Sequence, residues 1–339
     1  MDAQGGPTTI IATMSRVDRA TRKALRERER KERSTARRSS APELAARYEA
    51  LFEQLTRAHC VKYERRDWGA IAETGPVEPA VRAHALEKKA RRALTNYRPG
   101  IIDGLLGLQA DKRRALAERV LDAAKKDADL YGRAKRNADL HNLDVALAEP
   151  VAALDFGAIE TALKAHIPAR ELAPILEGLG VDMPSAGRLV VHVDVLELDA
   201  LPDESVRLND AGRSVHALLT PTARREMHLA NVCSVVLRVG LEVMAVVPIE
   251  RLDLLARCAL PGAKDGGEAE HHPILHVRLG HEALKAMDLR RLEPVSTVAA
   301  LGARLDWEIG RGFAPIPIED LKLVAQRGRD APERLAAPA

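Results

Sequence analysis

Histidine and carboxylate side chains, the residue types that bind metals and transfer protons, gather in the last third of the chain. The densest group contains His271, His272, His276, His281, Glu268, Glu270 and Glu282. On one strand His272 and His276 would lie about 13 Å apart, too far to share a zinc ion. His271 and His272 are candidate ligands only if the chain turns at Pro273. Because no Cys-x-x-Cys or His-Glu-x-x-His spacing accompanies them, we predict no metal site and no cofactor.

A second group suits general acid–base chemistry. His192 and Asp194 alternate with apolar residues between positions 189 and 195, which predicts a strand with both polar side chains on one face. His276, in a neighbouring predicted strand, would face the same way. A carboxylate beside an imidazole raises its basicity, as a general base requires. No nucleophile follows a recognisable strand and turn nearby, so an enzyme, hydrolase or nuclease-like, with a site at these three residues is the alternative interpretation.

Glycine-rich segments give little support for nucleotide binding. Gly178-Leu179-Gly180 follows a predicted helix, whereas a dinucleotide fingerprint follows a strand. Gly262, Gly266 and Gly267 lack the Gly-Lys-Ser/Thr sequence of a phosphate loop. We therefore predict structural turns at both places.

A polar stripe crosses an otherwise apolar helix predicted from Pro221 to about Val247. Its members are spaced three and four residues apart and share one face: Asn231, Ser234, Arg238 and Glu242. The two charged members are placed to form an ion pair, since a charge on an apolar helix needs a partner. The stripe is therefore either a structural edge or the wall of a groove for a ligand or partner.

The first 40 residues form a basic arm with eleven cationic and five acidic side chains. The cations are Arg16, Arg19, Arg22, Lys23, Arg26, Arg28, Arg30, Lys31, Arg33, Arg37 and Arg38. Too few apolar residues accompany them to bury a core, so we expect this arm to be disordered. Clustered cations neutralise phosphates without a sequence code. Three interpretations stay open: an idle extension, contact with nucleic acid, or docking on an acidic protein or anionic membrane.

The whole chain of 339 residues carries a net charge of +3. Its three cysteines suggest the cellular compartment. Cys60, Cys233 and Cys258 are odd in number and far apart, which is typical of a reducing cytoplasm and not of a disulfide framework. The one candidate membrane span, residues 229–247, contains two charged side chains that make insertion unfavourable. We predict a cytoplasmic protein without a transmembrane segment.

The spacing of apolar residues predicts the elements that hold these groups. Helices are expected at 44–55 and 86–97, where apolar residues recur every three or four positions. From Asp111 to about Ala148 alanine dominates these positions, which predicts a helical hairpin that resembles an antiparallel coiled coil. Five apolar residues would either pack its tip or contact a partner or a membrane surface: Ile101, Ile102, Leu105, Leu106 and Leu108.

Predicted strands alternate with helices after residue 188. They suggest a small mixed sheet covered by a long central helix, with short helices at 281–288 and 295–305. The fold class is therefore α+β. Its expected parts are a disordered basic arm (1–40), a helical hairpin module (41–150), short helices or a linker (151–187), an α+β domain (188–326) and a disordered tail (327–339).

Several segments resemble a pattern in conserved bacterial proteins of unassigned function. These are Asp67-Trp68, Tyr97-Arg98-Pro99-Gly100, Val232-Cys233, Leu237-Arg238, Glu242, Val247-Pro248, Pro273-Ile274-Leu275 and Val277. The resemblance covers most of residues 44–310 and implies a bacterial protein in two halves. It implies no activity, cofactor or catalytic residue.

Long amphipathic helices and the lack of a complete catalytic set favour a non-enzymatic interaction or adaptor protein. Its hairpin would contact a protein partner or a second copy of the chain. The arginine-rich arm would bind anionic partners, with nucleic acid among the candidates.

Overall fold

A computed structural model describes residues 8–11, 41–81, 83–100, 108–185, 187–260 and 271–317. The chain divides into two compact units. Unit 1 consists of Met1–Arg66 and Leu154–Ala339, and unit 2 consists of Asp67–Ala153. Unit 2 is therefore inserted in the sequence of unit 1, and the expected tail at 327–339 lies outside the described residues.

Unit 1 is built on a seven-stranded mixed sheet with the order β1-β2-β3-β6-β7-β8-β9. The strands are β1 (Thr8–Ile11), β2 (Leu176–Ser185), β3 (Arg188–Val195), β6 (Arg251–Ala259), β7 (His271–Gly280), β8 (Arg304–Glu308) and β9 (Gly312–Ala314). Among the described strands, β3 and β6 are the one parallel pair, and the chain between them includes α9 (Pro221–Val246). The predicted α+β class with a mixed sheet is confirmed.

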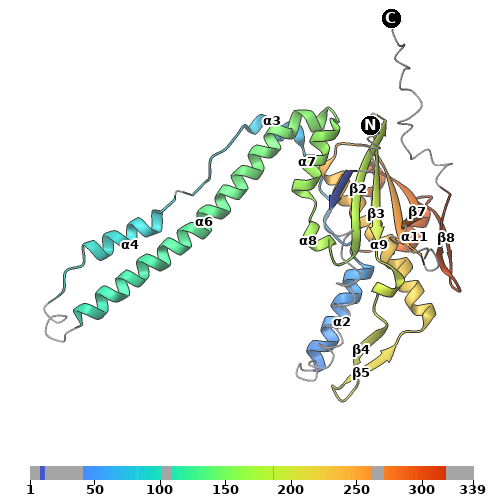
Figure 1. Ribbon diagram of the computed structural model, residues 1–339, viewed down its shortest axis with the longest axis horizontal. Coiled ribbons are helices and arrows are strands. Elements are labelled where there is room, and N and C mark those ends of the chain that lie inside the picture. The colour runs from blue at the N-terminus through green and yellow to red at the C-terminus, as the bar shows by residue number, and fades with distance from the viewer. Residues whose placement is uncertain are drawn as a thin grey trace, which may run out of the picture. The chain divides into compact units, whose positions relative to one another are not determined.

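Helix α9 packs directly on β3 and β6 (Figure 1). A Cβ atom at Gly240 would meet Leu279 Cδ1 at 2.2 Å and Leu254 Cδ1 at 2.9 Å, so glycine is what permits this close approach. In the described part of the chain, α9 alone is long and apolar enough to cross a bilayer, but 78% of its most apolar window is buried in the protein. This burial agrees with the prediction of no transmembrane segment.

Smaller helices of unit 1 surround this core. Helices α2 (Ala41–Thr56), α7 (Phe156–His166) and α11 (Pro294–Ala300) contact α9, and α10 (His281–Lys285) contacts β7. The other short helices are α8 (Ala169–Leu172) and the 3-10 helix η2 (Leu198–Ala200). Strands β4 (Glu204–Leu208) and β5 (Ser214–Leu218) form a separate hairpin beside α2.

The position of α2 differs from the predicted helical module at 41–150. Its apolar face includes Leu55, which is buried, and Tyr48, whose hydroxyl donates to the Glu204 carboxylate at 2.5 Å. Glu204 belongs to unit 1, as does α2 itself. The periodicity predicted the helix correctly, but Leu55 is its one buried residue, Leu51 of the same face is exposed, and the pattern carried no information about which unit would cover the helix.

Three further segments depart from the expected elements. Thr8–Ile11, within the arm expected to be disordered, pairs antiparallel with β2, and its β-branched residues favour that conformation. Residues 176–185, expected as helix or linker, form β2. The predicted helix at 295–305 ends at Ala300, and Gly302, with φ of +75°, turns the chain into β8.

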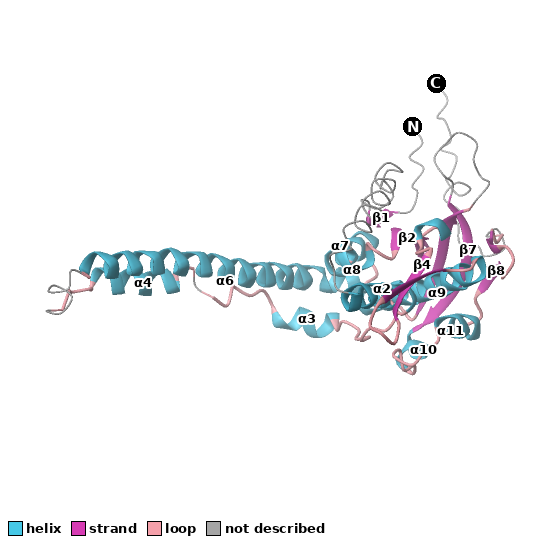
Figure 2. Cartoon of the chain, turned by 90° about the horizontal axis from the view of Figure 1, so that it is seen from below, coloured by secondary structure: helices cyan, strands magenta, loops and turns pink. Residues whose placement is uncertain are grey.

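Unit 2 is a helical hairpin. Helices α3 (Trp68–Thr74) and α4 (Ala85–Thr95) both pack along α6 (Gln109–Ala152), which is a single helix of 44 residues (Figure 2). The predicted tip residues 101, 102, 105 and 106 lie outside the described residues, whereas Leu108 is exposed at the start of α6.

A buried carboxylate joins the two long helices of unit 2. Asp127 of α6 accepts hydrogen bonds from the backbone N–H groups of Leu86 and Glu87, at 3.1 and 2.7 Å. His84, the N-cap residue of α4, makes no capping bond with its own side chain. Asp127 therefore caps α4 from the neighbouring helix.

Candidate functional site

The sheet face opposite α9 carries the predicted catalytic residues. Because Leu254 and Leu279 point toward α9, Asp253, Leu255 and Arg257 of β6 point to the other face. His192 and Asp194 of β3 lie beside Leu255 and Arg257 in the register, and His276 of β7 lies on the far side of Leu255. The three predicted residues share one face, but the strands of His192 and His276 are not neighbours as predicted, because β6 lies between β3 and β7.

Asp253 is the centre of one ionic cluster on this face. Its carboxylate, only 4% exposed, accepts hydrogen bonds from Arg188 at 3.1 Å, Arg278 at 3.0 Å and His276 at 3.0 Å. Burial alone would raise the pKa of Asp253. The hydrogen bonds from His276, Arg278 and Arg188 outweigh it and lower the pKa to about 2. Asp253 is thus a fixed anion held by two arginines and a histidine.

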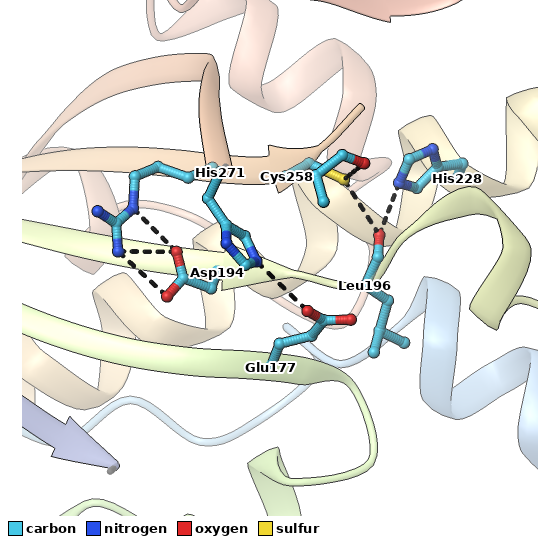
Figure 3. Close-up of polar contacts among 8 residues, drawn as sticks. Glu177, Asp194, Leu196, His228, Cys258 and His271 are labelled. Atoms are coloured by element: carbon cyan, nitrogen blue, oxygen red, sulfur yellow. Dashed lines mark hydrogen bonds and ion pairs between the residues drawn. The ribbon is translucent and has the colours of Figure 1, made fainter. Parts of the chain in front are cut away.

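A second cluster lies on the same side of the sheet, where β2, β3, β6 and β7 meet. Arg257 holds Asp194 with two hydrogen bonds, of 2.8 and 3.1 Å. Beside them His271 Nε2 lies 3.4 Å from the Glu177 carboxylate (Figure 3), and this hydrogen bond raises the pKa of His271. A Cβ at Gly178 would lie 2.8 Å from Asp194 Oδ2, so glycine makes room for the ion pair.

These strand glycines correct an expectation from the sequence. Gly178 and Gly180 were predicted to be turn residues, but they lie within β2 and oppose Asp194 and His192 in the register. The apolar residue between them, Leu179, is buried. Gly-Leu-Gly therefore reflects close packing of side chains between strands.

His192 differs from its neighbours because its Nδ1 atom is buried and has no hydrogen-bond partner in the described part of the chain. Burial, with a smaller contribution from the charge of Arg257, lowers the pKa of His192 to about 4. The imidazole is therefore neutral at pH 7, and its proton affinity is low for a general base.

The three predicted catalytic residues do not meet at one point. His192 and His276 flank Leu255, two strand spacings or about 10 Å apart. Asp194 is held by Arg257, and His276 by Asp253. Each polar group is therefore engaged in its own cluster.

The candidate metal ligands are also apart. His271 and His272 begin β7, so they point to opposite faces of a strand that runs through Pro273 without a turn. No group of three or more histidine, cysteine or acidic residues suited to a metal ion is found among the described residues. Glu268 and Glu270 lie outside them.

The polar stripe of α9 is covered by the chain itself. Asn231 donates to the Leu55 carbonyl at 2.9 Å, and Ser234 Oγ lies 2.9 Å from His59 Nδ1. Arg238 donates to the Ala58 carbonyl at 3.3 Å. The stripe binds the end of α2 and the segment that follows it, and is not an open groove.

Arg238 also forms the expected ion pair along the helix. Its guanidinium lies 2.7 Å from Glu242, and it makes a second ion pair with Glu171 at 2.9 Å. Burial raises the pKa of Glu242, against the opposing effect of Arg238. These contacts fit the structural interpretation of the stripe.

The sequence analysis missed a separation of charge along unit 2. Residues 83–100 and 108–136, which we call the basic half, contain fourteen lysines and arginines, all exposed, and six acidic residues. Residues 67–81 and 137–153, which we call the acidic base, contain six acidic residues and no lysine or arginine. The two segments of the acidic base lie on either side of the basic half in the sequence, and the packing of α3 along α6 brings them together.

Most cations of the basic half have no ion pair within the described ranges. These are Lys88, Lys89, Arg92, Arg98, Arg113, Arg114, Arg119, Lys125, Lys126, Lys135 and Arg136. Arg91 pairs with Glu87, and Arg133 donates to the Asp129 carbonyl. The basic half is therefore a cationic surface open to an anionic partner. The predicted cations of the arm, Arg16 to Arg38, lie outside the described residues.

Comparisons with protein-family models, curated proteins and solved structures give no match to this chain. The functional argument accordingly rests on its own residues.

Proposed function

We propose that this chain is a non-enzymatic interaction protein that contacts an anionic partner through the basic half of its helical hairpin. The observation that carries the proposal is the separation of charge in unit 2, with fourteen exposed cations at one end and none at the other. Such a concentrated positive field attracts polyanions and raises their association rate. The arginine-rich arm, at the same net sign, would add electrostatic affinity.

Contact with proteins belongs to the same proposal. An acidic surface on a partner would complement the basic half. A second copy of the chain offers one as well, because its acidic base would face the basic half in an antiparallel arrangement. A cytoplasmic location suits this role, and the three cysteines, all free thiols, are compatible with it.

A salt-elution experiment tests the proposal. The full chain should bind immobilised heparin, and the variant Arg113→Gln/Arg114→Gln/Lys125→Gln should elute at clearly lower salt. The control Arg207→Gln/Arg213→Gln/Lys285→Gln removes three exposed cations of unit 1 and should elute close to the unmodified protein. Equal elution of the two variants would show that the hairpin does not carry the binding.

A further inference from the structure

We infer that the basic half binds double-stranded DNA along its phosphate backbone, an inference that rests on the proposed function and names its partner. The first argument is the arrangement of cations on α6. At 100° per residue, Arg119, Lys126 and Arg133 lie within about 40° of one another, in a row with a spacing of about 10 Å. Arg114, Lys125 and Arg136 form a second row, with a spacing of about 16 Å.

The length of these rows favours an elongated polyanion. From Gln109 to Arg136, the cationic part of α6 extends over about 42 Å, whereas charges in solution are screened beyond about 8–10 Å. A compact anion would engage only a few of the cations. A duplex, with one phosphate charge per about 1.7 Å of its axis, can engage both rows along their length.

A single-stranded partner is less suited to this surface. Nonspecific single-strand binding relies on exposed aromatic side chains that stack on bases. The aromatic residues of the basic half are Tyr97 and Tyr131, and both are partly buried. Without base stacking, the basic half recognises its partner by charge alone. A duplex suits such recognition because it presents its phosphates outward at high density.

An anionic membrane fits less well for a similar reason. A helix that lies in a membrane surface needs a continuous apolar face. The exposed leucines of α6 are Leu121, Leu130 and Leu140, and at 100° per residue no two of them lie within about 80° of each other. They do not form such a face.

The form of the duplex follows from groove width. The major groove of B-DNA, about 12 Å wide, can admit the cationic face of α6 that α4 leaves exposed, so that side chains on both flanks reach phosphates. The major groove of A-form RNA is too narrow for this. Because Glu118, Asp122 and Asp129 alternate with the cations, we expect sequence-independent binding in the micromolar range at low salt.

Fluorescence anisotropy with the full chain and a labelled 24-base-pair DNA duplex tests the inference across a salt series. Arg119→Gln/Lys126→Gln/Arg133→Gln should weaken binding at least tenfold at low salt. It should also reduce the slope of log K against log salt by about 2.7, since each lost phosphate contact removes about 0.9. The unit 1 control, Arg207→Gln/Arg213→Gln/Lys285→Gln, should stay within about twofold at low salt and change the slope by less than one contact.

Three competing probes decide between outcomes. Unlabelled single strand of equal length, duplex RNA and vesicles with 30% phosphatidylserine should each compete less well than duplex DNA. Equal or better competition by any of them overturns the inference. An unchanged salt slope in Arg119→Gln/Lys126→Gln/Arg133→Gln, the row variant, overturns it as well. If the row variant loses heparin binding while the duplex is not bound, the DNA partner is wrong and the proposed function stands. If neither heparin binding nor duplex binding depends on the hairpin, both the inference and the proposed function are wrong.

Discussion

His192 and His228 are neutral at pH 7 because burial opposes their charged form. Burial lowers the pKa of both His192 and His228 to about 4. For His228 the Leu196 carbonyl, 2.9 Å from Nε2, opposes this effect (Figure 3). The unfolded chain binds a proton at each imidazole near pH 6.5. Between pH 6.5 and pH 4 the unfolded state therefore holds more protons, and stability falls with falling pH.

This linkage predicts an acid-sensitive unit 1. Between pH 7 and pH 5 the free energy of unfolding should fall by about 2 kcal/mol for each of the two histidines. His192→Gln should remove one share of that loss, as measured by urea denaturation at both pH values. Ala217→Gln, at an exposed position on β5, introduces the same side chain without removing an ionisable group and should leave the pH dependence unchanged. The same pH dependence in the His192 variant and the parent protein would contradict this account.

The ionic clusters show which contacts between residues can be predicted from a sequence and which cannot. Alternation placed His192 and Asp194 on one strand face, because the pleat of a single strand decides that. It did not reveal that Arg257 holds Asp194, or that Asp253 collects Arg188 and His276, since those contacts depend on the register between strands. The polar residues of β6, at alternate positions in an apolar strand, were the available signal for this second face.

At the scale of elements, the periodicity of polar side chains predicted helix α9 and strands β3, β6 and β7, because in each of them these side chains recur on one face. The periodicity did not show that the polar face would also be wholly or partly buried. Strand β2 was not predicted, because glycine usually interrupts a strand. The reason for these glycines is apparent only when the side chains opposite them are known. The cap of α4 had no local signal either, since Asp127 lies about 40 residues away in the sequence.

Removing that cap should loosen α4. Asp127→Ala leaves two backbone N–H groups without their partner, which should cost about 1 kcal/mol. We expect faster amide hydrogen exchange across Ala85–Thr95, with little change in the strands of unit 1. Asp129→Ala removes an exposed carboxylate two residues away on α6 and serves as the control. Unchanged exchange at Leu86 and Glu87 in the Asp127 variant would rule out the capping role.

At the scale of the molecule, each unit has its own kind of side-chain chemistry. The buried ionic clusters of unit 1 satisfy their charges internally, as with Asp253 and the α9 stripe. The basic half leaves most of its cations unpaired in the described part of the chain. Unpaired surface cations contribute little to folding, so their concentration at one end of the hairpin is better explained by binding.

A shortened hairpin tests whether anion binding belongs to unit 2 and folding stability to unit 1. Replacing residues 83–134 by a Gly-Ser linker removes most of the basic half but keeps the acidic base, in which Asn142 holds the backbone of Val77 through bonds of 2.7 and 3.0 Å. The buried core of the sheet and α9 lies outside the deleted segment. We expect the urea midpoint of unit 1 to stay the same, by circular dichroism, while heparin and duplex binding fall to the level that the arm supports. Loss of cooperative unfolding would instead make the hairpin part of the folding core, whereas undiminished binding would assign the anionic partner to the arm alone.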